Sequence, residues 1–87
     1  MQSQTVIVDH PQGFHARPVA RWVSLAQTFH SDITVKFESS TIDGKSALGL
    51  MALSIKSGAK LEICTSGPDE QEALAALVLL VQNHFQA

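Results

Sequence analysis

The sequence has one cysteine, no long apolar run and almost no excess charge. Because Cys64 is the only cysteine among 87 residues, no intrachain disulfide can form and no cysteine cluster can hold a structural zinc ion. No stretch approaches the roughly 20 apolar residues that a membrane-spanning helix needs. The first four residues also lack the basic segment of a secretory signal. We therefore expect a cytoplasmic protein that is neither exported nor membrane-embedded.

The net charge of −2 is too small to give a general attraction for nucleic acid or anionic lipid. We therefore expect no nucleic-acid partner. With 45% hydrophobic and 16% charged residues, the chain suits one compact domain over residues 1–87. A domain of this size buries only about 60 to 65% of its unfolded surface. Its chemistry should lie at the surface rather than in a deep cavity.

The first part of the chain shows a strand signal followed by a helix signal. Residues 5–8 are all β-branched and predict a strand with Val6 and Val8 on one face and Ile7 on the other. A helix of roughly 11 residues is expected to start near Ala16, with Pro18 in its first turn, where a missing N–H costs nothing. Its apolar stripe recurs at i, i+3, i+4 and i+7 and consists of Val19, Trp22, Val23 and Ala26.

The rest of the chain predicts a hairpin, a short helix, a strand and a long helix. Alternating apolar residues at 33, 35 and 37 indicate a strand that pairs with residues 41–43. Residues 46–53 predict a short helix, and alternation from residue 60 to Cys64 predicts a strand with Cys64 on the open sheet face. Asp69 and Glu72 have the spacing of a capping box for the last helix. Its expected buried stripe is Leu74, Leu77, Val78, Val81 and Phe85.

The predicted order of elements is therefore β-α-β-β-α-β-α. Four strands with helices on one side suggest an α+β fold with two layers. This is an open-faced β-sandwich, in which a mainly antiparallel sheet carries three helices on one face and leaves the other face to solvent.

His15 is the strongest candidate for chemistry. It directly precedes the first predicted helix, whose opening N–H groups and positive end can hold an anion. A neutral imidazole is nucleophilic, so it could accept a phosphoryl group on nitrogen. The guanidinium of Arg17 can contact two phosphate oxygens, and Arg21 one turn later can add positive potential for an acidic partner. Taken alone, the same pattern also fits a loop histidine beside a solvated charge.

Residues 13–18 read Gly-Phe-His-Ala-Arg-Pro. This segment resembles the Gly-Leu-His-Ala-Arg-Pro signature of the HPr family of the bacterial phosphoenolpyruvate-dependent sugar phosphotransferase system. Residues 44–53 resemble the family's second signature, and residues 67–74 resemble the start of its last helix. The resemblance covers nearly the whole chain and favours a functional role for His15.

The resemblance implies a phosphocarrier that is not itself an enzyme. Phosphorylated enzyme I would transfer its group to Nδ1 of His15, and the carrier would pass it to EIIA sugar-permease components. Arg17 would neutralise the phosphoryl oxygens together with backbone N–H groups of the helix start. No metal or other cofactor is expected. Because a carrier must release each partner quickly, we expect a monomer that forms brief, small interfaces.

The predicted short helix carries two further candidates. Ser46 matches the serine that HPr kinase/phosphorylase modifies in relatives, although serine is also a preferred N-cap residue. Phosphate on Ser46 is expected to inhibit transfer from acidic enzyme I. A carbon-catabolite transcription factor is then a further expected partner. The helix holds more apolar residues than it can bury. The family resemblance assigns the partner patch to Ala47, Leu48 and Met51, leaving Leu50 and Leu53 for the core.

Other functions remain open from the sequence. One alternative is a paralogue that serves a nitrogen-related, fructose or dihydroxyacetone phosphorelay, and another is a regulatory protein-binding module without phosphotransfer. Phe14, Val19 and Ser54 depart from the usual family residues and change side-chain size near the site and the short helix, which bears on partner preference rather than on phosphorylation of His15. A stand-alone enzyme is disfavoured, since the chain lacks a nucleotide loop, a paired catalytic carboxylate and a nucleophile elbow. The remaining histidines, at positions 10, 30 and 84, are assigned no role.

Overall fold

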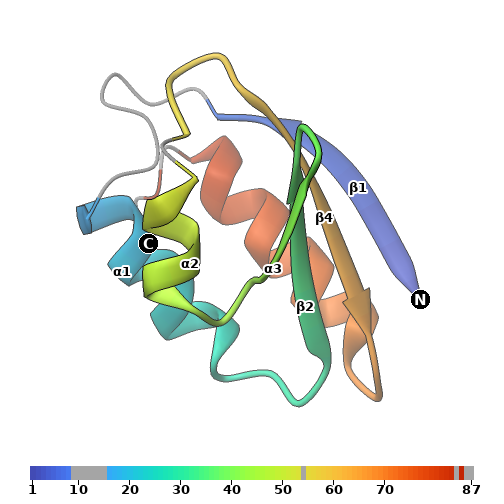
Figure 1. Cartoon of the computed structure of the whole chain (residues 1–87). Coiled ribbons are helices and arrows are strands. Elements are labelled where there is room, and N and C mark those ends of the chain that lie inside the picture. The colour runs from blue at the N-terminus through green and yellow to red at the C-terminus, as the bar shows by residue number, and fades with distance from the viewer. Residues whose placement is uncertain (9–15, 54, 84, 86–87) are drawn as a thin grey trace.

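The structure is a computed structural model that describes residues 1–8, 16–53, 55–83 and 85. The described residues form four strands and three helices in the predicted order (Figure 1). In chain order the elements are β1 (Gln2–Ile7), α1 (Ala16–Ala26), β2 (Asp32–Phe37), β3 (Ser40–Asp43), α2 (Ala47–Ala52), β4 (Lys60–Ser66) and α3 (Glu70–Gln82).

The strands form one antiparallel sheet in the order β1-β4-β2-β3. All three helices lie on the same side of this sheet, so its other face is open (Figure 1). The predicted open-faced α+β architecture is therefore confirmed. β1 starts earlier than predicted because polar residues also pair with β4: Gln2 lies opposite Thr65 and Ser3 lies opposite Cys64. Backbone pairing at a sheet edge does not require apolar side chains.

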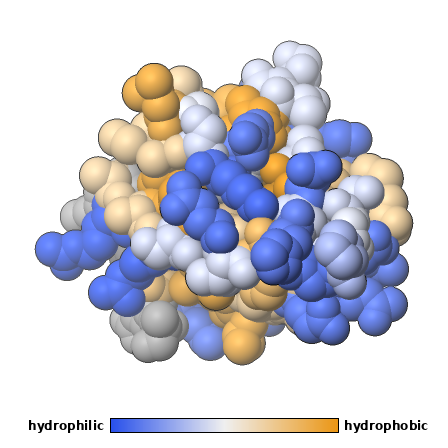
Figure 2. Space-filling view, turned by 90° about the horizontal axis from the view of Figure 1, so that it is seen from below, coloured by the Kyte–Doolittle hydropathy of each residue, from blue (hydrophilic) through white to orange (hydrophobic). Residues whose placement is uncertain are grey.

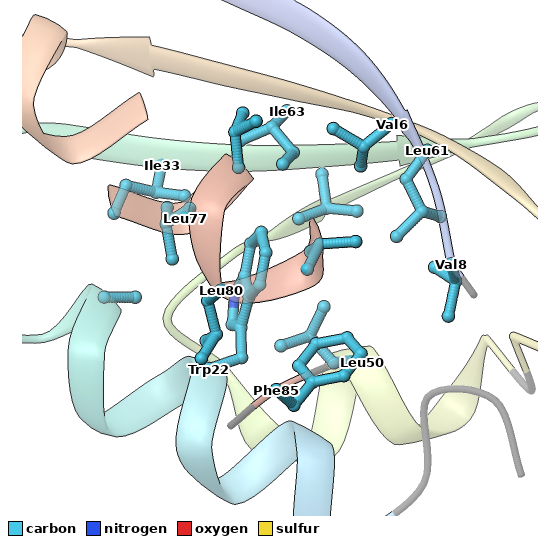
Figure 3. Packing of buried hydrophobic residues seen from close by; sticks show 14 of the residues in the cluster. Val6, Val8, Trp22, Ile33, Leu50, Leu61, Ile63, Leu77, Leu80 and Phe85 are labelled. Carbon is cyan, nitrogen blue, oxygen red and sulfur yellow. The ribbon is translucent and has the colours of Figure 1, made fainter. Parts of the chain in front are cut away.

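The core lies between the sheet and the helices (Figure 3). Val6 and Val8 are buried and Ile7 is exposed, as the predicted alternation requires. Trp22 is fully buried, and its indole N–H donates to the carbonyl oxygen of Gly44 at 2.7 Å. This bond satisfies the one polar group of a large core side chain and ties α1 to the segment before α2.

Two predictions about individual residues need correction, and a third residue lies on its predicted face but is buried there. The capping box does not form, because Asp69 occupies the N-cap position of α3 without a side-chain cap hydrogen bond. Cys64 lies on the open face with Glu62, yet it is only 3% exposed, because β4 is central and Ser3 and Thr34 flank the thiol. Phe85 is buried as predicted but lies beyond the end of α3, so it does not belong to the helical stripe.

The carboxylate of Asp69 instead joins two loops. It accepts hydrogen bonds from the backbone N–H groups of His30, at 2.9 Å, and Ser31, at 2.8 Å, and also from the Ser31 hydroxyl. The Asp69 N–H donates back to Ser31 Oγ at 3.1 Å. We call this pair the Ser31–Asp69 clasp. The Ser31 hydroxyl, followed by the His30 N–H, lowers the pKa of Asp69 to about 2, since these donors favour the ionised form.

The clasp lies at the end of the molecule where the α1–β2 and β4–α3 loops meet, lowest in Figure 1. Figure 2 looks at this end and shows hydrophilic residues over its middle, with hydrophobic atoms toward the rim. Among the described residues, no helix is long and apolar enough to cross a membrane.

Candidate functional site

The predicted site residues fall on the start of α1 and on α2. His15 lies outside the described residues, as do His10, Gly13, Phe14, Ser54 and His84. Arg17, Arg21, Ser46, Ala47, Leu48 and Met51 are all described. The geometry of the site is therefore built from the two helices that follow His15 in the sequence.

α1 begins at Ala16, the residue directly after His15. Pro18 is buried in the first turn, while Arg17 beside it is exposed. The opening N–H groups of a helix have no partner within the helix and form the positive end of its dipole. No acidic residue in the first turn of α1 offsets that positive end. The start of α1 thus combines an exposed guanidinium with helix N–H groups, which is a suitable environment for a phosphoryl group.

Arg21 lies one turn further along α1 and has a partner within the chain. Its Nη1 donates to the carbonyl oxygen of Phe85 at 3.1 Å. The sequence predicted only a surface charge at this position. Nothing in the sequence pattern pointed to this link, because 64 residues separate Arg21 from Phe85 and every residue carries a carbonyl group.

Ser46 is the N-cap of α2. Its φ of −105° and ψ of 110° are extended, and its Oγ accepts a hydrogen bond from the N–H of Gly49 at 3.1 Å. The capping interpretation of Ser46 is therefore confirmed. The residue is only half-buried, so a cap and a modification site are compatible at this position.

The outer side of α2 carries exposed apolar side chains. Leu48 is 82% exposed and Met51 is 46% exposed, whereas Leu50 on the inner side is fully buried. Ala47 is exposed as well, and α2 contains no charged residue. We call Ala47, Leu48 and Met51 the α2 patch. Its exposure agrees with the prediction that α2 holds more apolar residues than the core can cover.

α2 packs beside α1, so the α2 patch and Arg17 lie on neighbouring helices (Figure 1). Two long-range hydrogen bonds hold the chain before α2 in place. One is the bond from Trp22 to the Gly44 carbonyl, and the other joins Lys45 Nζ to the carbonyl oxygen of Phe29 at 2.8 Å. Neither bond could be predicted for Gly44 or Lys45, because a long-range hydrogen bond to a backbone carbonyl has no local sequence signal.

Comparison with known proteins agrees with this arrangement. The family model described as "PTS HPr component phosphorylation site" matches residues 2–83. The phosphocarrier protein HPr of Treponema pallidum is 40% identical over 86 residues, which cover 99% of this chain and 98% of that protein. Both matches extend over nearly the whole sequence, including the segments that carry the candidate site.

Solved structures show the same fold. A crystal structure of HPr-C-His from Thermoanaerobacter tengcongensis superposes with a TM-score of 0.95 and 35% identity, covering 98% of this chain and 96% of that one. Crh of Bacillus subtilis, described as a domain-swapped dimer, gives a TM-score of 0.78 and 36% identity with full coverage of both chains. With its fold, its motifs and its relatives in agreement, the chain belongs to the HPr family of phosphocarrier proteins of the phosphotransferase system.

Proposed function

We propose that this phosphocarrier accepts a phosphoryl group on His15 from phosphorylated enzyme I and donates it to EIIA components of sugar permeases. The observation that carries the proposal is the position of His15 in the family signature, directly before Ala16, where α1 begins with the exposed Arg17 and the buried Pro18. Transfer between histidines needs positioning and charge stabilisation rather than new covalent machinery in the carrier.

Each step is an in-line transfer. The imidazole nitrogen of His15 attacks the phosphorus, and the bond from phosphorus to the donor histidine of enzyme I breaks. In the second step a histidine of EIIA attacks the phosphorus, and the bond from phosphorus to His15 breaks. In our proposal Arg17 binds the phosphoryl oxygens, and the N–H groups at the start of α1 stabilise the negative charge on these oxygens. Exposure of Arg17 leaves room for a partner to approach.

Intact-mass spectrometry tests the acceptor residue. The chain is incubated with phosphoenolpyruvate and enzyme I, and the mass is read at neutral to alkaline pH. We expect one acid-labile phosphate on the wild type and none on His15→Ala. His30→Ala is the matched control, because His30 is exposed in the loop between α1 and β2, and it should be phosphorylated like the wild type. A phosphate that persists in His15→Ala would refute the proposal.

We further propose that HPr kinase/phosphorylase modifies Ser46 and that this modification slows transfer from enzyme I. Phosphate at the N-cap would be tolerated by the helix, since it lies at the positive end of α2, but it would add negative charge beside the α2 patch. Ser46→Asp should therefore reduce the rate of phosphorylation by enzyme I. Ser57→Asp, at an exposed serine beyond α2, should not. Equal effects of the two variants would argue against a specific role for Ser46.

We propose that the chain works as a cytoplasmic monomer, and that a carbon-catabolite transcription factor binds its Ser46-phosphorylated form. The small extent of the α2 patch supports brief partner contacts rather than a permanent interface. Sedimentation equilibrium over a range of concentrations tests the monomer, and a dimer at micromolar concentration would contradict it. Comparing EIIA proteins as phosphate acceptors would identify the relay that the carrier serves.

A further inference from the structure

Arg21 connects α1 to the end of the chain in an unusual way. Phe85 has a φ of +63°, in the left-handed region that a residue with a bulky side chain rarely adopts. Its N–H donates to the carbonyl oxygen of Leu80 at 2.7 Å, so the chain turns back at the end of α3. The Phe85 carbonyl then accepts the hydrogen bond from Arg21. A strained conformation of this kind persists only where surrounding contacts hold it.

The side chain of Phe85 occupies the junction of the three helices. It is 2% exposed and belongs to the same buried cluster as Trp22 of α1, Leu50 of α2 and Leu80 of α3. Figure 3 shows its ring beside Leu50, in the part of the core where Trp22 and Leu80 also lie. The backbone of Phe85 is thus held by Arg21, while its ring contributes to the surface on which Leu50 rests.

α2 depends on such contacts for its orientation. A helix of six residues is far too short to be stable by itself, so tertiary packing must fix its direction. Leu50 points into the core from the inner side of α2, and Leu48 and Met51 lie on the outer side. A change in how Leu50 packs against the core therefore turns the whole of α2, and with it the α2 patch, relative to the start of α1.

We propose that Arg21 is a positioning residue that acts through Phe85 to orient the α2 patch. The consequence for phosphotransfer rests on the proposed function; the structural link does not. This role differs from that of a surface cation attracting an acidic partner, for which only the charge matters. Positioning requires the hydrogen bond to the Phe85 carbonyl, and a lysine at this position would keep the charge on a shorter side chain whose donor lies elsewhere.

The experiment compares Arg21→Gln, Arg21→Lys, Phe85→Ala and the double variant Arg21→Gln/Phe85→Ala. Lys36→Gln is the matched control, because it removes one positive charge from an exposed position on the open sheet face. The methyl resonances of Leu48 and Met51 are recorded by NMR, and KM and kcat for the carrier are measured with enzyme I. Circular dichroism selects a temperature at which every variant is folded.

We expect Arg21→Gln and Phe85→Ala each to shift the Met51 methyl resonance and to raise KM about fivefold with kcat nearly unchanged. The double variant should be no worse than the more affected single variant, because both changes break one link. Arg21→Lys should remain impaired, and Lys36→Gln should match the wild type.

The positioning role is overturned if Arg21→Lys restores KM completely, or if Arg21→Gln leaves the Met51 resonance unchanged. Additive effects of the two single changes would also overturn it. If the wild type accepts no phosphoryl group from enzyme I, the proposed function fails, and the methyl shifts still decide whether Arg21 orients α2.

Discussion

The clasp end of the molecule and the outer side of α2 use their side chains in opposite ways. At the clasp end, Ser31 and Asp69 bond to each other and to the backbone, and Lys45 bonds to the Phe29 carbonyl. On α2, Leu48 and Met51 leave apolar area in water. The clasp therefore stabilises the fold of the chain itself. The α2 patch can stabilise only a complex, because its apolar area is removed from water when a partner covers it.

The same contrast exists within α2 itself, and its inner side should give the largest effect. Leu50→Ala removes a fully buried side chain from the helix junction, so the free energy of unfolding should fall by about 2–5 kcal/mol. Urea unfolding followed by the fluorescence of Trp22 measures this loss. A fall below about 1 kcal/mol would mean that the junction closes around the smaller side chain.

At the clasp end, Gly67→Ala should be the most damaging change. Gly67 has a φ of +148°, and an added Cβ would lie 2.7 Å from the Cα of Ser31 and 2.8 Å from its Oγ. We expect a loss of about 2–3 kcal/mol in the free energy of unfolding. Gly58→Ala is the control: its φ is +90° but nothing lies within 4 Å of the new Cβ, so only about 1 kcal/mol should be lost. Equal losses would show that crowding against Ser31 is unimportant.

A smaller effect is expected when the charge of Asp69 is removed. Asp69→Asn should lower Tm at pH 7 by about 5 °C, since the amide accepts the clasp hydrogen bonds less strongly. The pKa of Asp69 is lowered from 3.8 to about 2. Ionised Asp69 therefore stabilises the fold above pH 3.8, and this contribution is lost as the pH falls toward 2.

Thermal unfolding of wild type and Asp69→Asn between pH 2 and 7 tests that dependence, because the other carboxylates contribute nearly equally to both proteins. The difference in Tm should be constant above about pH 5 and should shrink below about pH 4. A difference that stays the same down to pH 2 would show that the charge of Asp69 does not support the clasp.

Local patterns in the sequence predicted most of the fold but not the clasp. Alternation placed Val6 and Val8 inside, and helical spacing placed Trp22 in the core, because burial of one face imposes a period on each element. Asp69 was predicted to cap α3 from its spacing to Glu72. Its carboxylate instead bonds to His30 and Ser31, which lie 38 or more residues away in the sequence, and these three donors satisfy it better than one helix N–H could.

The candidate site divides in the same way. Exposure of Leu48 and Met51 was predictable, since α2 has more apolar side chains than one buried side can hold. The hydrogen-bond partner of Arg21 was not predictable, because a residue of any type can accept a hydrogen bond through its backbone carbonyl. Cys64 lies on the predicted face, and its burial there could not be predicted because it depends on neighbours in two other strands.

The smallest effect on stability should come from substitutions in the α2 patch, whose main effect should be on binding to enzyme I. Leu48→Ala removes a side chain that is mostly in water, so the free energy of unfolding should change by less than about 0.5 kcal/mol. Met51 is about half exposed, so Met51→Ala should cost less than about 1 kcal/mol. Both should nevertheless raise KM for the carrier with enzyme I, by about tenfold for Leu48→Ala, because a partner would bury this area.

Leu79→Ala provides the matched control, since Leu79 is a 57% exposed leucine on α3 rather than α2. Steady-state phosphorylation by enzyme I, with urea unfolding of the same samples, separates recognition from stability. Leu79→Ala should leave KM unchanged. If it raises KM as much as Leu48→Ala does, exposed apolar area anywhere on the carrier promotes binding, and the α2 patch loses its special role. A normal KM in Leu48→Ala would instead place the partner contact elsewhere on the helical layer.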